Sequence, residues 1–348
     1  MKKLTLLLLA LLYVTLTYAY TERDLLQKQA DINRLKEILV LDRQWVTYPD
    51  YNDRAGWDRF LGTFKDEYIR RGEKRLNYQW QVVKATDYLA FERTGNRQIM
   101  EKPFGANNGA IADLLMAELA EGKGRFVDQL INGVFNACEM TSWALAAHII
   151  VQPSHRALPA YDYPVIDLTS GDLGGLLAWT YHFMRPSFDK VDPEISRRLR
   201  HELQTRILDP YMNNDSFWWM GRNYNGRMLN NWNPWCNSNA LMCFMLLEDN
   251  RDTLAKAVHL TMESVDKFLN YIKADGACEE GPSYWGHAAG KTLDYLELLS
   301  DITGDKVNIF NEPMIKNMGE YISRSYIGNG WAVSYTHLRA HETPEHLV

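Results

Sequence analysis

The stretch that decides the fold is residues 253–272, TLAKAVHLTMESVDKFLNYI. Its large apolar side chains return every three or four residues, at Leu254, Val258, Met262, Val265, Leu269 and Ile272. This spacing gathers them on one face of an α-helix, whereas a half-buried strand would alternate apolar and polar residues. We therefore predict a helix over the whole stretch.

The same spacing recurs along the chain from Thr21 onward. It predicts further helices over residues 126–151, 193–208, 239–247, 288–302 and 313–326. Asp192 and Pro193 are typical of a helix start, and Gly304 is typical of a helix end. Asp209-Pro210 is predicted to end another helix. Because almost no strand pattern is present, the predicted fold class is all-α.

The arrangement of these helices is inferred from what the pattern lacks. No heptad is sustained, which argues against a coiled coil, and no exact repeat argues for an open solenoid. Long helices joined by loops of several residues favour antiparallel hairpins. We expect these hairpins to form a closed (α/α) toroid, one large domain over residues 20–331.

Residues 1–19 are typical of a secretory signal peptide. Lys2 and Lys3 form a basic start, residues 4–16 form an apolar stretch, and residues 17–19 resemble a cleavage site. The apolar stretch is shorter than the roughly 20 residues that a membrane-spanning helix needs. We expect cleavage before Tyr20, a periplasmic or secreted protein, and no membrane association once the signal is removed.

The composition restricts the partners of the protein. A formal net charge of −6 argues against nucleic acid, and an acidic substrate would have to meet a local basic patch. The 11 Trp and 19 Tyr residues are enough for aromatic sugar platforms as well as for packing. Nothing in the sequence indicates an oligomeric state.

Four cysteines are too few for a disulfide scaffold in a chain of this length. Cys236 and Cys243 are seven residues apart on one predicted helix, so about 10 Å of helix rise separates them and prevents a bond. A pair among Cys138, Cys236 and Cys278 is open. We predict core thiols.

Residues 332–348, AVSYTHLRAHETPEHLV, break the helical pattern. They show no clear periodicity and carry three of the nine histidines. The segment resembles the translation of a sequencing adapter, so we leave it out of the fold and the site. A His-rich metal tract is the alternative, because the spacing of His337 and His341 can place both on one helix face.

Two short patches differ from the helical background: residues 230–237, NNWNPWCN, and residues 275–287, DGACEEGPSYWGH. We predict that both are non-helical and line a polar cleft on the helical scaffold. Mixtures of amides, carboxylates and aromatic rings of this kind bind sugars. The alternative is a capped helix entrance with Asn237 or Ser238 as N-cap, which would explain one or two of the asparagines but not all of them.

Several segments carry a family resemblance, in order and at suitable separation. They are residues 139–148 (EMTSWALAAH), 209–211 (DPY), 217–220 (FWWM), 230–235 (NNWNPW) and 275–286 (DGACEEGPSYWG). Together they resemble the N-terminal helical domain of heparinase II/III-like polysaccharide lyases over most of residues 60–330. The resemblance implies an incomplete (α/α) toroid, normally followed by a β-sandwich domain, and β-elimination of uronate-containing polysaccharides.

The resemblance also implies two catalytic residues. Asn231 would neutralise the uronate carboxylate, and Tyr284 would handle protons at the scissile bond. The chemistry explains these groups, because the C5 proton of a uronate is acidic enough only when the developing enolate charge is stabilised. A neutral phenol can protonate the leaving oxygen, and a cationic neighbour of Tyr284 would favour phenolate. Candidate neighbours are Arg222, Arg227, His287 and Lys291.

Two features depart from the family pattern. Trp232 stands where many relatives carry a histidine, so proton transfer at that position would be lost. The β-sandwich domain, with the histidine and the metal site that it carries in relatives, is expected to be missing. We therefore expect a fragment with poor activity, no metal and no cofactor.

The remaining site candidates are predicted to bind substrate. Trp232 and Trp285 are expected to be exposed, since each interrupts a polar motif. Glu139 and His148 are placed on one long helix, on roughly perpendicular faces. The full set of predicted binding residues is Asn230, Trp232, Asn233, Glu280, Trp285, His287, Arg227, Glu139 and His148.

Two other functions are weighed against the lyase. An inverting glycoside hydrolase on a similar helical barrel would use Glu279 or Glu280 as general acid, with a second carboxylate across the cleft. A non-catalytic glycan-binding protein would use the tryptophans alone. Unsaturated uronate products would distinguish the lyase from both. The sequence leaves the identity of the acidic polysaccharide open.

Overall fold

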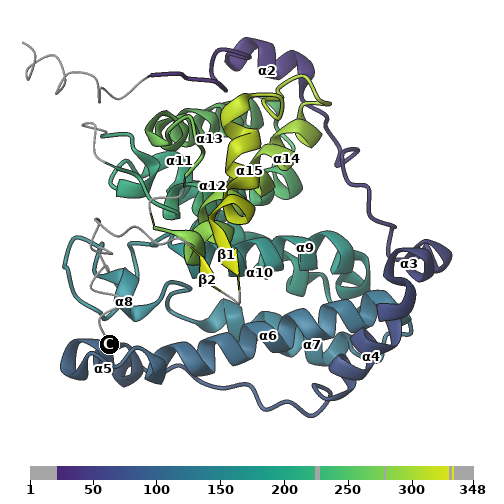
Figure 1. The fold of residues 1–348 in the computed structure, drawn as a ribbon. Helices are drawn as coiled ribbons and strands as arrows, with labels where there is room; N and C mark the ends of the chain where they lie inside the picture. Colours follow the sequence, from purple (N-terminus) through teal and green to yellow (C-terminus); the bar gives the residue numbers. More distant parts are fainter. Residues whose placement is uncertain (1–21, 224–227, 278–279, 329–330, 333–348) are drawn as a thin grey trace, which may run out of the picture.

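The computed structural model describes residues 22–223, 228–277, 280–328 and 331–332, and its fold is almost entirely helical, as predicted (Figure 1). The described strands are β1 (Tyr326–Gly328) and β2 (Trp331–Ala332), which form one antiparallel pair. No described helix is long and apolar enough to span a bilayer. The predicted signal peptide at residues 1–19 lies outside the described residues.

The helices are joined by connections of very different length. The α-helices are α2 (Ile32–Ile38), α3 (Arg54–Leu61), α4 (Lys65–Glu73), α5 (Ala85–Thr94), α6 (Gln98–Glu121), α7 (Val127–Glu139), α8 (Ala146–Ile149), α9 (Leu168–Val191), α10 (Pro193–Leu203), α11 (Asp209–Asn213), α12 (Trp232–Leu247), α13 (Arg251–Tyr271), α14 (Lys291–Ile302) and α15 (Pro313–Ser325). Short 3-10 turns are η1 (Gly62–Phe64), η3 (Trp218–Met220) and η4 (Pro282–Tyr284). Two π turns are η2 (Gln204–Leu208) and η5 (Gly286–Gly290).

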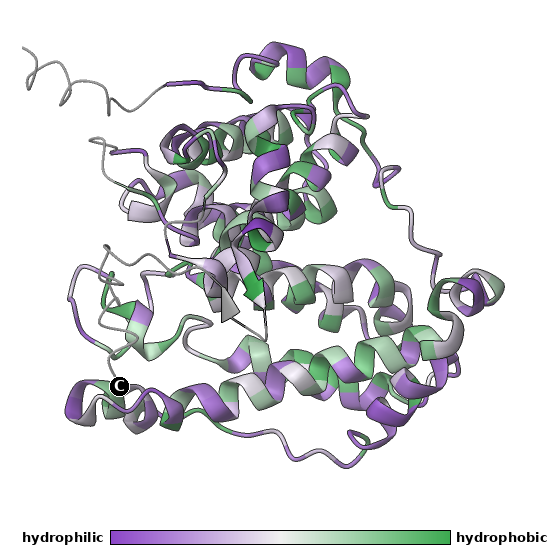
Figure 2. Ribbon diagram, viewed as in Figure 1, coloured by the Kyte–Doolittle hydropathy of each residue, from purple (hydrophilic) through white to green (hydrophobic). Residues whose placement is uncertain are grey.

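Helix α12 lies at the centre of the molecule and packs against α9, α13 and α14. Its apolar residues occur on all sides rather than in one stripe, and Leu241, Phe244 and Leu247 are fully buried. The long helix α6 forms a second layer with α4 and α7, below α9 and α10 in the view of Figure 1. Hydrophilic residues dominate the outer side of the peripheral helix α2 (Figure 2). The first residues of α12 are therefore held by helices on several sides.

Several helix ends agree with the prediction. Helix α13 covers the stretch that opened the sequence analysis, with the Asn250 side chain capping its start. Asp192 caps α10 by accepting a hydrogen bond from the Glu194 N–H, and Pro193 occupies the first helical position. Gly304 follows α14 with a φ of 56°, in the left-handed region that glycine tolerates. Local capping chemistry thus identified these ends.

The single helix predicted over residues 126–151 was wrong. Helix α7 ends at Glu139, Met140 is extended, and α8 follows as a separate short helix. The break is stabilised by tertiary contacts, because Trp143 donates its indole N–H to Ala137 O and Tyr88 donates to Ser142 O. Apolar spacing continues through the break, but burial of Trp143 decides the backbone path. Glu139 and His148 therefore belong to different elements.

Two other boundaries were also wrong. Helix α12 begins at Trp232 rather than at residue 239, with Pro234 in its first turn, where a missing N–H costs nothing. Pro210 does not end a helix, because π turn η2 widens the helix before it and runs directly into α11. The first polar patch is consequently the start of a helix and not a loop.

The cysteines whose surroundings are described behave as core thiols. Cys138, Cys236 and Cys243 are buried and free, and burial raises the pKa of the Cys138 and Cys243 thiols to about 12. Such thiols stay protonated at neutral pH and are poor nucleophiles. Cys278 and the tail from residue 333 onward, with His337, His341 and His346, lie outside the described residues.

Candidate functional site

Asn231 and Tyr284 line one cavity of about 240 Å³, which we call the Asn231 cavity. The two residues are far apart in the sequence and reach the cavity from the start of α12 and from η4. Five further predicted site residues line the same cavity: Asn230, Trp232, Glu280, His287 and His148. Both polar patches of the sequence therefore meet in one place, together with α8.

Helix starts surround the Asn231 cavity. Leu168 and Thr169 line it from the first turn of α9, Trp232 from the first turn of α12, and His287 from η5, which leads into α14. The start of a helix carries a partial positive charge and backbone N–H groups without intrahelical partners. The cavity is thus disposed to receive a negatively charged group.

The entrance to α12 presents the amides predicted from the sequence. The Asn231 backbone N–H donates to Glu280 Oε2 at 3.2 Å, and Asn230 Oδ1 accepts from the Trp232 N–H at 3.1 Å. Among the described residues, nothing hydrogen-bonds to the side-chain amide of Asn231, which is almost fully buried at the cavity wall. The amide is thus available to a ligand in the cavity, which would gain that hydrogen bond.

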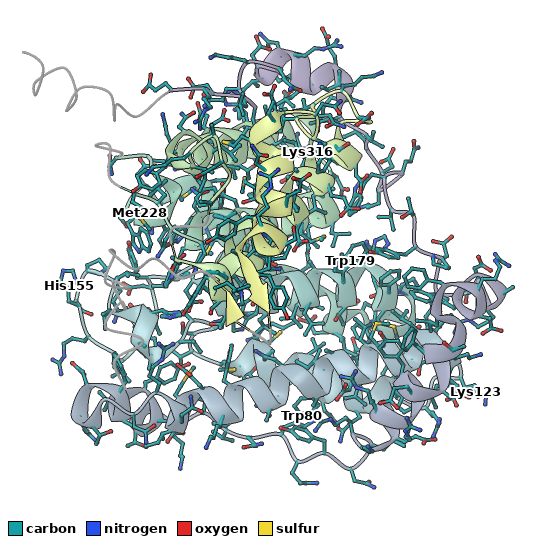
Figure 3. All side chains as sticks on the ribbon, in the orientation of Figure 1. Trp80, Lys123, His155, Trp179, Met228 and Lys316 are labelled. Carbon is teal, nitrogen blue, oxygen red and sulfur yellow. The ribbon has the colours of Figure 1, made fainter. Side chains whose placement is uncertain are left out.

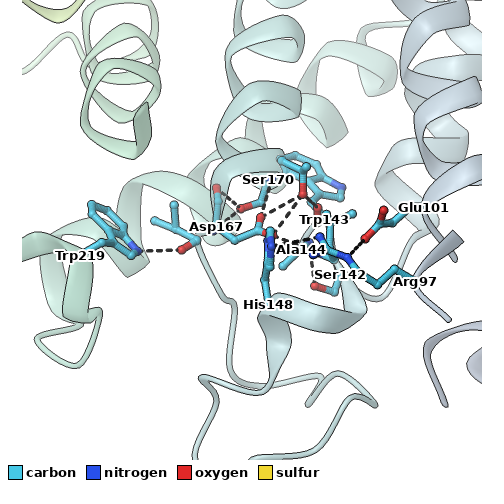
Figure 4. Close-up of polar contacts among 12 residues, drawn as sticks. Arg97, Glu101, Ser142, Trp143, Ala144, His148, Asp167, Ser170 and Trp219 are labelled. Carbon is cyan, nitrogen blue, oxygen red and sulfur yellow. Dashed lines mark hydrogen bonds and ion pairs between the residues drawn. The ribbon is translucent and has the colours of Figure 1, made fainter. Parts of the chain in front are cut away.

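His148 is oriented by a buried carboxylate (Figure 4). Asp167 is fully enclosed, and its Oδ2 lies 2.6 Å from His148 Nδ1. Burial pushes the pKa of Asp167 upward, but the hydrogen bond and charge of His148 and the N–H groups of Ser170 and Leu145 outweigh it, so the pKa is lowered. Since ionised Asp167 can only accept, we assign the shared proton to Nδ1. Nε2 is then the ring nitrogen that faces Arg97, and it can accept a proton only while the ring is neutral.

Arg97 lies on the opposite side of the His148 ring. Its guanidinium comes within 3.4 Å of His148 Nε2, and its Nε donates to Glu101 at 2.6 Å (Figure 4). Arg97 also lines the cavity, so a guanidinium that is paired with Glu101 lies at the cavity wall.

The aromatic lining differs from the prediction. Trp232 was expected to be exposed, but it is 6% exposed and packs between His148, at 4.7 Å, and Trp218, at 5.4 Å between ring centroids. Trp235, which was not predicted as a site residue, stacks on His287 at 4.7 Å with nearly parallel rings. Tyr284 meets the same His287 ring edge-on at 5.6 Å. His287, rather than Trp232, is therefore the accessible ring.

Some predicted site residues do not reach the cavity. Asn233 is fully buried in the core, where its amide donates to Trp219 O and Ser264 O, a structural role. Glu139 lies at the exposed end of α7 and pairs with Arg198 at 3.3 Å. Trp285 is half-buried, and its indole donates to Met318 O. Arg227 lies outside the described residues.

Some of the suggested cationic neighbours of Tyr284 lie at the cavity, and others lie away from it. His287 contacts the Tyr284 ring, whereas Arg222 pairs with Asp215 and donates to Tyr211 O, away from the cavity. Lys291 lies near the Trp235 ring, 5.8 Å from its centroid. His287 is thus the one of these three that touches the phenol.

Sequence reasoning missed Asp167 and Arg97. Asp167 and Ser170 form a capping box at the start of α9, so the sequence signal existed but indicated only a helix start. Arg97 precedes α6 and gives no local signal.

No family model matches the chain, and no curated protein matches it significantly. Within the described residues, no three His, Cys, Asp or Glu side chains are grouped to hold a metal ion.

Proposed function

We propose that this protein is a polysaccharide lyase that cleaves a uronic-acid-containing polysaccharide by β-elimination in the Asn231 cavity. The observation that carries the proposal is the meeting of three groups in one cavity: the Asn231 amide, the Tyr284 phenol and the His148 imidazole held by Asp167. Elimination next to a carboxylate needs these three types of group, to stabilise the enolate, to donate a proton and to accept one.

The uronate carboxylate would bind at the helix starts. Asn231 offers an amide without a partner in the described structure, and the Arg97 guanidinium lines the same wall. As the C5 proton leaves, negative charge moves onto the carboxylate oxygens, where a fixed amide and a cation stabilise it. The residues thus favour the transition state over the bound substrate.

Two residues would move the protons. His148 Nε2 takes the C5 proton, and the electrons of that C–H bond form the C4–C5 double bond. The C4–O bond breaks, and Tyr284 gives its hydroxyl proton to the departing oxygen. Exchange with water then returns His148 to the neutral form and Tyr284 to the phenol. His148 suits the first step because the hydrogen bond to Asp167 fixes the orientation and the tautomer of its ring.

The hydrolase reading has less support. An inverting hydrolase needs two carboxylates on opposite sides of the scissile bond. Among the described residues that line the cavity, Glu280 is the only carboxylate, and it accepts the Asn231 N–H. A glycan-binding protein without catalysis would not need an imidazole held by a fully buried aspartate.

The wider assignment belongs to the same proposal. We infer that the helices form an incomplete (α/α) toroid, which is supported by the packing of successive helices from α6 and α7 through α9 and α10 to α12, α13 and α14. A periplasmic or secreted location follows from the signal-like residues 1–19. An acidic polysaccharide would be available there.

Product analysis tests the function. The full chain is incubated separately with alginate, with polygalacturonate and with heparan sulfate, and the products are analysed by ultraviolet absorbance and mass spectrometry. We expect unsaturated uronate ends from at least one polymer, and their loss in the Asn231→Ala variant. Products heavier by one water would indicate hydrolysis, and binding without products would indicate a glycan-binding protein; either result overturns the proposal.

A further inference from the structure

A second cavity, about 290 Å³ in volume, lies beside the segment that links α2 to α3. We call it the Trp179 cavity; Figure 3 labels Trp179. One wall is aromatic, with Trp45, Tyr48 and Trp179, and another is acidic, with Asp294, Glu297 and Asp301 of α14. Among the described residues, none lines both this cavity and the Asn231 cavity.

The aromatic wall is a corner of three rings, which we call the aromatic corner. Trp179 lies 5.8 Å from Trp45 and 5.4 Å from Tyr48 between ring centroids, and both pairs meet edge-to-face. Tyr48 keeps 44% of its surface exposed, so its ring is open to a ligand. The negative faces of such rings attract organic cations, and the rings also offer apolar surface to the carbon chain of the cation.

The acidic wall lies along one face of α14. Asp294, Glu297 and Asp301 follow at intervals of three and four residues. Asp294 pairs with Lys291 at 3.2 Å, whereas no described residue forms an ion pair with Glu297 or Asp301. Burial, and then the charge of Glu297, raise the pKa of Asp301. Two neighbouring carboxylates of the lining are therefore without a cation from the described part of the chain.

Lys291 shows how an ammonium group is held at this wall. Its Nζ pairs with Asp294 and lies 5.8 Å from the centroid of the Trp235 ring, so a carboxylate and an aromatic ring hold one cation together. The same combination recurs farther along α14, where the two carboxylates without a cation share the cavity with the aromatic corner. That second position is suited to an ammonium group supplied by a ligand.

The spacing of the carboxylates distinguishes between kinds of cation. Glu297 and Asp301 are four residues apart, which corresponds to about 6 Å of helix rise. A metal ion needs ligands that converge on one point, and in the part of the chain that the structure describes no three His, Cys, Asp or Glu side chains are grouped in that way. Two ammonium groups joined by a short carbon chain match separated carboxylates better. The lining thus favours a linear diamine over a metal ion.

We propose that the Trp179 cavity binds a linear aliphatic diamine or polyamine. One ammonium group pairs with Glu297 and the next with Asp301, while the carbon chain and part of the charge lie against the aromatic corner. This site does not depend on the function proposed for the Asn231 cavity, because the two cavities have no described lining residue in common. The protein thus carries a site for an organic cation besides the site for an acidic ligand.

Calorimetric titration of the full chain with small cations tests the proposal. The probes are putrescine, which is a four-carbon diamine, and butylamine, tetramethylammonium and Mg²⁺. We expect putrescine to bind more tightly than butylamine by about threefold or more, because the monoamine pairs with only one carboxylate at a time. Tetramethylammonium has no N–H donor and Mg²⁺ has no apolar chain, so both should bind more weakly than putrescine.

Variants of the lining separate the contributions of the two walls. Glu297→Gln and Asp301→Asn should each weaken putrescine binding by a few-fold and reduce its advantage over butylamine, because one carboxylate remains. Tyr48→Ala should weaken the binding of both amines by up to about fivefold, because the ring serves either ligand. The matched controls Asp128→Asn and Tyr161→Ala remove an exposed carboxylate and an exposed ring elsewhere, and neither should change the binding of either amine.

Several results would overturn the diamine site. They are no putrescine binding, equal affinity for putrescine and butylamine, or putrescine binding that is unchanged in both Glu297→Gln and Asp301→Asn. Binding of tetramethylammonium or Mg²⁺ as tight as that of putrescine would also overturn it, because the rings alone or the charge alone would then explain the binding. Circular dichroism melting establishes that each variant is folded. The two α14 variants alter exposed side chains, so they decide the test if Tyr48→Ala melts early.

Discussion

The Asn231 cavity and the Trp179 cavity are similar in volume, about 240 and 290 Å³, and are built on the same three helices. Their chemistry is nevertheless opposite. The first lies at the helix starts and combines amide, phenol and imidazole groups with Arg97. The second lies farther along the same helices and combines three carboxylates with an aromatic corner.

This difference shows how helix direction can favour ligands of opposite charge at two places along the same helices. Helices α9, α12 and α14 all run from the first cavity toward the second, so their positive ends are gathered on one side. The carboxylates of α14 strengthen the contrast at the other side. An anion is thus favoured in the first cavity and a cation in the second.

The difference between the two cavities would be contradicted most strongly if Tyr284 could be replaced without loss of activity. We expect Tyr284→Phe to lower kcat by about 10² to 10⁴-fold, because the proton donor to the leaving oxygen is lost while the ring remains. Ultraviolet absorbance of the unsaturated product measures the rate. Polysaccharide affinity should change little, and the control Tyr161→Phe should retain full activity. A Tyr284→Phe enzyme with normal kcat would remove the catalytic distinction between the cavities.

Asn231→Ala is expected to have the next largest effect. Loss of the amide should lower kcat by about 10² to 10³-fold, since it acts on the charge that develops at the carboxylate. Single-turnover kinetics separate this loss from weaker binding. Asn132→Ala is the matched control, because Asn132 is exposed on α7 and does not line the Asn231 cavity. Equal losses in both variants would contradict a specific role for Asn231.

A third test concerns the support of His148. Asp167→Asn should lower the free energy of unfolding by about 3 kcal/mol at pH 7, because it removes the charge from a buried pair. The folded pKa of Asp167 is lowered, so its contribution is complete above the unfolded value of about 3.9 and is lost as the pH falls through the folded pKa.

The difference in free energy of unfolding between the wild type and Asp167→Asn should therefore become smaller when urea unfolding is repeated below pH 4. The exposed Asp162→Asn variant should show little change at any pH. A gap that stays constant down to pH 3 would mean that the charge of Asp167 does not stabilise the fold.

The smallest expected effect concerns Lys291 and tests the difference in charge between the two cavities. Lys291 lines the Trp179 cavity, where it pairs with Asp294, and it lies near the Trp235 ring of the Asn231 cavity. Lys291→Met should tighten putrescine binding and weaken the binding of a galacturonic acid trimer, each by no more than a few-fold, because the charge is partly exposed and screened. Titrations at low and high salt provide the measurement. Shifts of the same sign for both ligands would argue against the charge contrast.

Much of the fold could be predicted because local signals determine it. The apolar period of residues 253–272 and the Asp192 cap lie within a few residues of the structure that they predict. The break after Glu139 could not be read in this way, because it depends on Tyr88 and Trp143 contacts formed only in the folded chain. The ring arrangement of the helices stays a prediction.

The candidate site was likewise predicted only where local sequence determines it. Residue types and motifs selected Asn231 and Tyr284, and both reach one cavity. Trp232 and Asn233 were misjudged because polar neighbours in sequence do not reveal which side of a helix is buried. Arg97 was missed because it comes from a distant segment. The sequence identified the chemical types of the site residues, but it did not show where distant segments lie in the fold.

The Asp167 carboxylate offers a way to monitor the support of His148. Asp167 receives His148 Nδ1 on one oxygen and the Ser170 amide on the other. Deuterium uptake at the Ser170 amide would consequently follow the integrity of the imidazole support, without any substrate or assay. The rate at which that single proton exchanges with solvent would report how often the His148 imidazole and its carboxylate partner separate.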